Sequence, residues 1–486
     1  MLEKARKSRF LRDSAILQGS GGVVAGSQLL TSVLLAHQLT SEGQGLYFLA
    51  LKIYGLYFML LNVGVASAAV SQIGAAVTRN QKEKVAAWQA FTVKAYALIG
   101  ILLFAAGYWI LPPAVHLFGD GGNPELATWA WWLCLSPVLE LGRVLAQITF
   151  QGTRKMKYLA RLDVGTELGR LALIAFAALV FGTPKAAVLA TLGSCLVGSV
   201  WGLWLYRSTA KDDQTVPLPT LGAIVRRVRE VPLRVGMPLG LRLGFLRSID
   251  ALSCDVLPPL FLYFAGVQTQ AVEDPESWVA YFIVAQKIML LPSVLLSGVA
   301  RTALPTLSGV AGRKDPDAFR RGVFRISLFG GVITLAGLIP VLLLLPIAVW
   351  IVYPADYVEP VGLLALILTL GYVIKGFSGV LETFYIVANR LKAALVISTL
   401  SMMVAVPLML FLTLALPKTG AAWGINANFS AVFVHFAYIL LFFRRGEHRS
   451  LFRDASQVDS GSSGEVPNDP ESPGDLEKMD QPLGKA

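Results

Sequence analysis

Residues 19–75 read GSGGVVAGSQLLTSVLLAHQLTSEGQGLYFLALKIYGLYFMLLNVGVASAAVSQIGA. Two long apolar runs stand in this stretch on either side of a short polar turn. Each run is long enough to cross a bilayer core of ~30 Å as a helix that rises 1.5 Å per residue. The first run is also too long for the apolar core of a cleavable signal peptide. The stretch therefore predicts two transmembrane helices in a polytopic membrane protein.

The pattern of this opening recurs along the whole chain. Hydrophobic residues make up 55% of the sequence and charged residues 15%, whereas soluble domains carry about 25% charged residues. We expect about twelve spans of membrane-crossing length, at 15–38, 45–75, 86–111, 127–150, 162–182, 186–206, 235–265, 278–300, 326–353, 359–387, 393–416 and 421–443. The predicted fold class is an all-α polytopic membrane protein.

Lys and Arg are distributed unevenly over the connections between these spans. The net charge is +11, and most positive residues fall in the N-terminal segment, the even-numbered connections and the segment after the last span. The odd-numbered connections carry only Lys185 and Lys418. Positive residues near helix ends stay on the cytoplasmic side, so we expect a bacterial inner-membrane protein with both termini in the cytoplasm. Such clusters contact anionic membrane lipids and argue against a nucleic-acid partner.

The long connection after the sixth span divides the chain into two halves. It contains LGAIVRRVREVPLRVG (221–236), a basic amphipathic stretch typical of a helix on the membrane surface. After about residue 455, Ser, Gly, Pro, Asp and Glu dominate, which predicts disorder. The expected organisation is a basic cytoplasmic segment 1–14, an N-terminal lobe 15–206, an amphipathic linker 207–234, a C-terminal lobe 235–443 and a disordered cytoplasmic tail 444–486.

The two halves are related in sequence. YFLALKI (Tyr47–Ile53) aligns without a gap with YFIVAQK (Tyr281–Lys287), and the same register matches the GVA triplets at 64–66 and 298–300. Because both halves are expected to begin in the cytoplasm, the repeats are parallel and related by an axis along the membrane normal. The predicted architecture is therefore two parallel six-helix lobes around a central cavity.

Each lobe is expected to open with a glycine-rich helix, at 15–38 and at 235–265. Glycine lowers the cost of bending, and Pro238 in the second of these helices removes a backbone hydrogen bond. Small residues also allow two helices to approach closely. Both interpretations, a kinked helix and close helix packing, remain open at this point.

Charged residues inside the spans fall into two groups. A charge at membrane depth costs at least ~2.5–3.5 kcal/mol, so it needs a partner, a wet cavity or access to the interface. Glu140 and Arg143 are three residues apart on the fourth span, as are Glu167 and Arg170 on the fifth. This spacing puts each pair on one helix face. A structural ion-pair network is the favoured interpretation, and a ligand site is the alternative.

In the second group, Lys52 and Lys287 have no acidic residue on their own spans. Lys52 and Lys287 occupy adjacent positions in the two repeats, and Arg242 and Arg247 lie on the seventh span. The first, second, seventh and eighth spans should border the space between the lobes. These four cations therefore predict a cationic cavity that binds substrate. The alternative is pairing with acids on neighbouring helices or, for Arg247, with Asp250.

Three carboxylates in the spans are candidates for ion coupling, namely Asp250, Asp255 and Glu382. A buried carboxylate can bind H⁺ or Na⁺. No other cofactor is expected, and no metal site, because the four histidines are scattered and the three cysteines lie far apart. The connections predicted to lie outside are too short for the catalytic loops that membrane sugar ligases and polymerases carry. The sequence therefore argues against an enzyme.

The opening of the chain resembles a known family. The small-residue first span, LLAHQLTSEGQGLYFLA (Leu34–Ala50) and NVGVASAAV (Asn62–Val70) resemble the first two helices of polysaccharide (O-antigen type) flippases. These belong to the multidrug/oligosaccharidyl-lipid/polysaccharide exporter (MOP) superfamily. The resemblance implies export of an undecaprenyl-diphosphate-linked oligosaccharide by alternating access. It also implies cations in the central cavity that engage the anionic diphosphate or acidic sugars, and polysaccharide polymerase or glycosyltransferases as partners.

Two alternatives to this function remain. A multidrug exporter of the same superfamily would favour cationic drugs and would carry carboxylates in its N-terminal lobe, but the first span has no acidic residue between Ala15 and His37. An integral-membrane glycan ligase or transferase is the alternative from another class. The positive balance of the predicted cavity favours an anionic substrate.

Overall fold

The computed structural model of the full chain describes residues 9–61, 64–78, 81–117, 125–212, 218–233, 248–249, 251–292, 316–378, 381–388 and 390–446. Within these ranges the chain forms helices joined by short turns and contains no strand. The all-α fold class is confirmed.

The first set of helices, which we call the N-lobe, lies between residues 9 and 212. Its helices are α2 (Arg9–Gln38), α3 (Ser41–Leu61), α4 (Val65–Thr78), α5 (Lys82–Leu117), α6 (Glu125–Leu133), α7 (Ser136–Leu139), α8 (Leu141–Gly152), α9 (Met156–Phe181) and α10 (Pro184–Asp212). In this lobe α9 packs between α2 and α10, and α4 packs against α5 and α8.

The second set, which we call the C-lobe, lies between residues 248 and 446. It contains the π-helical turn η2 (Leu252–Val256), α13 (Leu257–Thr269), a helix over residues 275–292, α15 (Pro316–Val352), the short turn η3 (Ala355–Tyr357), α16 (Val358–Phe377), α17 (Leu381–Val387), α18 (Leu391–Ala415), α19 (Gly420–Phe429) and α20 (Ala431–Arg444). Here α16 packs against α15 and α19, and α18 packs against α13 and α19.

The predicted linker contains a helix, α11 (Leu221–Glu230), that packs against α5. Ile224 is its buried residue, and Arg227 forms an ion pair with Glu83 of α5 (Nη2–Oε2 3.0 Å). The amphipathic helix α11 therefore packs against the N-lobe through its apolar side and one arginine.

Eight described helices are long and apolar enough to cross a membrane, and the bent pair 125–139 and 141–152 makes a ninth span. These nine correspond to nine of the predicted spans. The other three, at 45–75, 235–265 and 278–300, each include residues outside the described ranges, and their described parts are mainly helical. The structure thus agrees with the predicted twelve-helix arrangement of a multi-pass membrane protein.

Several helices are longer than the hydropathy pattern predicts, among them α15 and α2. α15 begins at Pro316 rather than near residue 326, and α2 begins at Arg9 rather than near residue 15. Hydropathy marks only the membrane-embedded part of a helix, and polar residues continue it beyond the bilayer. In α15 this extension is amphipathic, since Phe319 and Val323 are buried, and Phe319 stacks on Phe384 of α17.

The fourth predicted span is bent by 49° between Leu139 and Leu141. Pro137 lies at the start of the short helix α7, where its ring removes a backbone donor. The N–H groups of Cys134 and Leu135 bond three residues back rather than four, at 3.0 Å each. A tight turn therefore replaces one turn of α-helix, and Glu140 lies at the bend.

Three glycines of α2 are explained neither by close packing against the described residues nor by a break. α2 runs without interruption from Arg9 to Gln38, and a Cβ added at Gly19, Gly22 or Gly26 would meet nothing within 4 Å. The corresponding early part of the 235–265 span lies outside the described residues.

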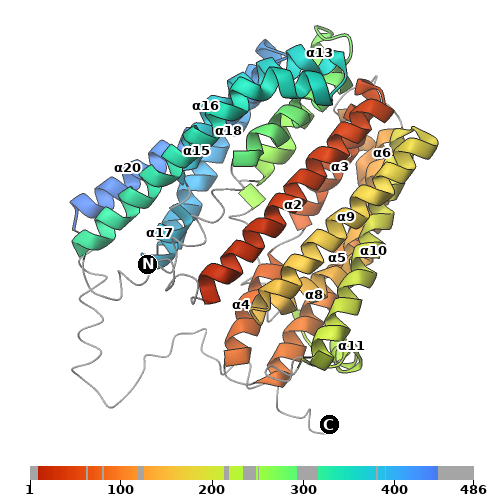
Figure 1. Cartoon of the computed structure of the whole chain (residues 1–486), viewed down its shortest axis with the longest axis vertical. Coiled ribbons are helices and arrows are strands. Elements are labelled where there is room, and N and C mark those ends of the chain that lie inside the picture. Colours follow the sequence, from red (N-terminus) through yellow and green to blue (C-terminus); the bar gives the residue numbers. More distant parts are fainter. Residues whose placement is uncertain are drawn as a thin grey trace.

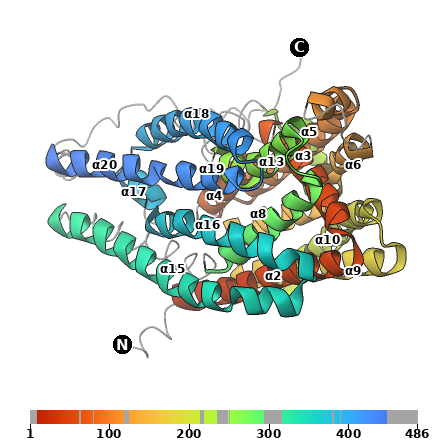
Figure 2. The same cartoon turned by 90° about the horizontal axis from the view of Figure 1, so that it is seen from above.

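The two lobes meet at one end of the molecule and separate toward the other. In Figure 1 the helices of the two lobes converge near α13 and α6, while α17 and α20 lie far from α4, α8 and α11. Figure 2 shows the two bundles side by side, with α15 and α20 on one side and α5, α6 and α10 on the other. The end at which they converge carries the odd-numbered connections, such as 38–41, 181–184 and 352–358. We call it the predicted outer end.

The outward faces of both bundles are apolar. Large side chains on α5, α9, α10, α15 and α18 are exposed, with Trp109 and Trp350 at 75% and 70%. A soluble protein does not expose contiguous apolar surface of this size. Tryptophan is enriched where a membrane protein meets the bilayer interface, so these faces are the lipid-facing surface.

Candidate functional site

The helix α3 lies between the two lobes and contacts both of them. Its N-terminus is capped by Thr40, whose Oγ1 accepts a hydrogen bond from the N–H of Gly43 at 3.1 Å. Toward the N-lobe, the hydroxyls of Tyr47 and Thr191 lie 3.1 Å apart, and Ser136 donates to the hydroxyl of Tyr54 at 2.5 Å. The other face of α3 is turned to the C-lobe.

Near the predicted outer end, that second face makes close polar contacts with the C-lobe. Ser277 donates to Ser41 (Oγ–Oγ 3.1 Å), and the hydroxyl of Tyr357 donates to Oε1 of Gln44 at 2.6 Å. A Cβ added at Gly45 would lie 1.8 Å from the carbonyl oxygen of Glu276. Only glycine allows the two backbones to approach this closely, so the lobes are tightly closed here.

Further along the same face, Lys52 forms an ion pair with Asp255 of the C-lobe (Nζ–Oδ1 2.6 Å). The lysine side chain is 15% exposed and the aspartate side chain 53% exposed. One turn later, a Cβ at Gly55 would lie 3.7 Å from Val256. The ion pair thus joins the lobes near the middle of the membrane-crossing part of α3.

Asp255 is held by an irregular turn, η2, whose origin is visible in the sequence. Pro258 and Pro259 have no N–H groups to bond the carbonyls four residues earlier. The N–H of Leu257 instead bonds five residues back, to the carbonyl of Leu252, which makes the turn π-helical. The carbonyl of Cys254, which Pro258 leaves without a helical donor, accepts a hydrogen bond from Nε2 of Gln286 at 2.7 Å. π-helical turns occur frequently at functional sites.

The second lysine of the predicted cavity, Lys287, lies across the same interface in a different way. Its ammonium stands 4.5 Å from the centre of the Phe48 ring on α3, a cation–π contact between lobes. Among the described residues, its ammonium makes no ion pair. The charged groups that lie close enough to Lys287 to interact with it are Arg170, Lys52, Glu167 and Asp255.

These five charged groups form one cluster between the lobes, which we call the interlobe cluster. Three members are basic side chains and two are carboxylates. It contains Lys52, Arg170 and Glu167 from the N-lobe, and Asp255 and Lys287 from the C-lobe.

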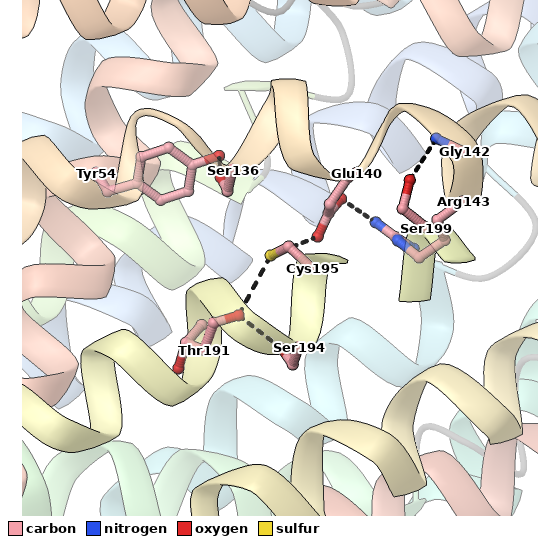
Figure 3. Close-up of polar contacts among 9 residues, drawn as sticks. All are labelled: Tyr54, Ser136, Glu140, Gly142, Arg143, Thr191, Ser194, Cys195 and Ser199. Atoms are coloured by element: carbon pink, nitrogen blue, oxygen red, sulfur yellow. Dashed lines mark hydrogen bonds and ion pairs between the residues drawn. The ribbon is translucent and has the colours of Figure 1, made fainter. Parts of the chain in front are cut away.

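The predicted structural ion pairs are present inside the N-lobe. Arg143 pairs with Glu140, and Arg170 pairs with Glu167 (Nη2–Oε1 2.5 Å), each within one helix. Figure 3 shows Glu140 between Arg143 and the thiol of Cys195 on α10, which donates to Oε1 at 3.3 Å. The expected pairs are therefore confirmed, and Cys195 is a neighbour that the sequence pattern did not indicate.

The remaining predicted site residues cannot be placed in this geometry. Arg242, Arg247 and Asp250 lie outside the described residues, as does the side chain of Glu382 on α17. In the parts of the chain that are described, no group of three or more His, Cys, Asp or Glu could hold a metal ion.

The identity of the partner of Lys52 is the feature that the sequence did not indicate. For Lys52 a cationic cavity was favoured and pairing with an acid on a neighbouring helix was the alternative, while Asp255 was a candidate for ion coupling. The depths of the two residues in the membrane indicate this pairing. Lys52 lies about two helical turns, and Asp255 about three, from the outer ends of their predicted spans. Residues at equal depth on helices that border the same space are candidates for pairing.

A family profile described as "Polysaccharide biosynthesis protein" matches residues 10–310. Among solved structures, the chain is similar to the eukaryotic MATE transporter AtDTX14, with 16% identity over 92% of this chain and 99% of that one and a TM-score of 0.65. It is also similar to a MOP superfamily transporter from Pyrococcus furiosus, with 20% identity over 92% and 98% of the two chains and a TM-score of 0.62.

A third similar structure is an inward-facing multidrug resistance MATE family transporter of the MOP superfamily, with 16% identity over 88% of this chain and 95% of that one and a TM-score of 0.61. No curated protein matches the sequence. The family profile covers more than half of the chain, and the solved structures share its fold. The chain therefore belongs to the polysaccharide biosynthesis protein family and has the fold of the MOP superfamily transporters.

Proposed function

We propose that this protein moves an undecaprenyl-diphosphate-linked oligosaccharide across the bacterial inner membrane by alternating access, for cell-surface polysaccharide biosynthesis. The observation that carries the proposal is that basic side chains outnumber acidic ones in the interlobe cluster of a transporter fold. Lys52 and Lys287 reach it from opposite lobes. A lysine ammonium acts as a point charge, so it can attract a diphosphate without requiring one sugar geometry.

The arrangement of the lobes supports alternating access. The contacts along α3 close the predicted outer end, while the lobes separate toward the other end (Figure 1). A substrate would enter between the lobes from the separated end and leave after the contacts along α3 have opened. One of the similar solved structures is described as inward-facing, which agrees with this direction.

A multidrug exporter is the competing function, since several similar structures are multidrug transporters. Such a protein would need a site that attracts cationic drugs, whereas basic side chains outnumber acidic ones in the described interlobe cluster. The similar Pyrococcus transporter is described as having a binding pocket of reverse polarity that suggests a different function, so the polarity of the binding pocket differs among proteins of this fold. The protein is accordingly proposed to be a transporter and not an enzyme.

Proteoliposomes containing the purified protein distinguish these functions. The expected result is accelerated movement of a fluorescent undecaprenyl-diphosphate-linked oligosaccharide between leaflets, compared with protein-free vesicles. Efflux of a cationic dye without lipid movement would favour a multidrug exporter. A new covalent product on the lipid would favour a glycan ligase or transferase.

The same vesicles test ion coupling, for which Asp250, Asp255 and Glu382 remain the candidates. Dependence of the transport rate on an imposed H⁺ or Na⁺ gradient would establish coupling. Polysaccharide polymerase and glycosyltransferases are proposed partners, and copurification would reveal them.

Orientation is proposed from the positive residues. Reporter fusions after Gly121 and Pro275 should read outside, and fusions near Lys155 and Asp315 should read inside. A reversal at any of these positions would contradict the predicted topology there.

A further inference from the structure

We propose that Asp255 is the built-in counter-ion of Lys52, and that the anionic diphosphate of the substrate displaces it, so that binding opens the contact between the lobes. The identity of the anion rests on the proposed function, whereas the counter-ion exchange rests on the interface alone.

The first argument is the order of the contacts along α3. Residues 41, 45, 48, 52 and 55 are three or four apart, and residue 44 is three from 41 and four from 48, so all six lie on one face. Each of them contacts the C-lobe, from Ser41 at the predicted outer end to Gly55. The fourteen steps from residue 41 to residue 55 cover about 21 Å at 1.5 Å per residue.

Lys52–Asp255 is the last polar contact in this row, counted from the predicted outer end. Beyond α3, the next helix of the same span, α4, packs against α5 and α8 of its own lobe. A substrate that arrives from the separated end therefore meets the ion pair before it meets the contacts of Ser41, Gln44 and Gly45.

The second argument is the unequal exposure of the two partners. The aspartate is 53% exposed, while the lysine is 15% exposed. The counter-ion is thus the solvent-facing member of the pair. An ion pair with an exposed member contributes little net stability because water and salt compete for it. A diphosphate carries more negative charge than one carboxylate, and it has Lys287 as a second cation near Lys52.

The third argument is that Asp255 stays with the C-lobe when it releases Lys52. Its turn is anchored by Gln286 on the carbonyl of Cys254 (2.7 Å). Asn428 of α19 also donates to the hydroxyl of Ser253 at 3.2 Å and to the sulfur of Cys254 at 3.0 Å. These are contacts within one lobe. Exchange of the counter-ion therefore breaks a link between lobes without unfolding either one.

The contact of Lys287 with Phe48 adds to this coupling. It also joins the two lobes, and the carboxylate of Asp255 lies near both lysines. Without Asp255, the two cations would repel each other across the interface. The aspartate thus holds the lobes together when no anion is bound.

The test measures closure and anion binding separately. Ser41 and Ser277 are replaced by cysteine, because their hydroxyl oxygens lie 3.1 Å apart, and the rate of disulfide formation at constant pH reports closure. Asp255→Asn and Lys52→Gln are introduced in this background, with Glu273→Gln as the control because Glu273 is an exposed acid of the same lobe. Inorganic pyrophosphate is the soluble probe, and undecaprenyl diphosphate and undecaprenyl monophosphate in nanodiscs are the lipid probes. Monodisperse elution of every variant confirms that it is folded.

Without any anion, Asp255→Asn should slow disulfide formation several-fold, whereas Glu273→Gln should not. The exchange of both charges, Lys52→Asp with Asp255→Lys, should restore the rate. Pyrophosphate should slow disulfide formation in the parent protein, with a midpoint about tenfold lower in Asp255→Asn because the competing charge is gone. The rate of disulfide formation in Lys52→Gln should not change when pyrophosphate is added. Undecaprenyl diphosphate should act at lower concentration than undecaprenyl monophosphate.

Closure that is unchanged in Asp255→Asn, or a midpoint no lower than that of the parent, would overturn the counter-ion role. Equal responses of the parent and Lys52→Gln to pyrophosphate would overturn the displacement step. If the expected pattern holds but the protein does not move lipid-linked oligosaccharide, the counter-ion exchange stands and the proposed function fails.

Discussion

The ion pairs inside the N-lobe and the ion pair between the lobes differ in what they connect. Glu140–Arg143 and Glu167–Arg170 each join residues three apart within one lobe, so both partners move together when that lobe moves. Lys52–Asp255 joins residues of different lobes, so it must break when the lobes separate. The ion pairs inside the N-lobe neutralise charge within a rigid body. The ion pair between the lobes is one that a transport cycle can break and form again.

Charge reversal at the lysines of the interlobe cluster should have the largest effect. Lys52→Glu combined with Lys287→Glu should lower transport by on the order of 100-fold, because like charges then oppose the diphosphate. The double Lys→Arg variant should keep much of the activity, and the double Lys→Gln variant should be less active than either single variant. Leaflet movement in proteoliposomes measures the rate, normalised to protein abundance. Full transport by the double Glu variant would remove the electrostatic mechanism.

A large side chain at Gly45 should break the closed end and leave the ion pairs of the N-lobe untouched. Gly45→Leu puts a Cβ where only 1.8 Å separates it from the carbonyl oxygen of Glu276, and overpacking of this kind costs about 1–3 kcal/mol. Disulfide formation between cysteines at positions 41 and 277 should slow, and transport should fall. Gly22→Leu is the matched control, since a Cβ there meets nothing within 4 Å. Equal rates of disulfide formation and of transport in the two variants would mean that closure of the lobes does not depend on the close approach of Gly45 to Glu276.

Removal of an arginine from an ion pair inside the N-lobe should act on stability. Arg143→Ala leaves a carboxylate without its partner inside the N-lobe, and Arg170→Ala does the same while it also removes a basic side chain from the interlobe cluster. The loss should be roughly 1–2 kcal/mol, between the values for exposed and fully buried pairs. Lower abundance in the membrane and a lower Tm of the purified protein are the expected readouts. The exposed Arg229 of α11 offers a control substitution to Ala with no such change.

Closure at the predicted outer end should weaken slightly as the pH rises. Burial, and then the nearby carboxylates of Glu42 and Asp274, raise the pKa of Glu276 above its ordinary value of 4.5. The closed state therefore binds this proton more tightly than an open state that exposes Glu276. The stabilisation of the closed state is complete below pH 4.5 and is lost as the pH rises through the raised pKa.

Spin labels at the exposed residues Gln38 and Gln270, one in each lobe, measure this closure without thiol chemistry that depends on pH. In the parent protein, the fraction of molecules with a short distance between the two spin labels should decrease as the pH rises. Glu276→Gln should remain closed over the same range, and an unchanged slope in that variant would assign the pH dependence to another group.

The fold was predictable from the sequence to a greater degree than the site. Apolar runs and the GVA and YF repeats predicted the all-α fold with two related lobes, because hydropathy and register depend on local sequence alone. The bend at Glu140 was missed because Pro137 was read as part of a continuous span. The pairs three residues apart, such as Glu167–Arg170, were predictable because the geometry of one helix fixes them.

Contacts between lobes were not predictable in the same way. The approach of Gly45 to Glu276 and the pair Lys52–Asp255 depend on how two rigid bodies are docked, which no periodicity within one helix specifies. The π-helical turn at Asp255 was partly visible, since Pro258 and Pro259 indicate irregular backbone. The sequence alone does not show that the side chain of Gln286 donates a hydrogen bond to the carbonyl of Cys254 in this turn.

The most direct test of the proposed recognition compares two substrates that differ by one phosphate group and its negative charge. Leaflet movement by the wild-type protein is measured for one oligosaccharide linked to undecaprenol through a diphosphate and for the same oligosaccharide linked through a monophosphate. We predict faster movement of the diphosphate form, and a smaller difference in the Lys52→Gln and Lys287→Gln double variant. Equal rates for the two lipids in the wild-type protein would contradict recognition of the diphosphate by the interlobe cluster.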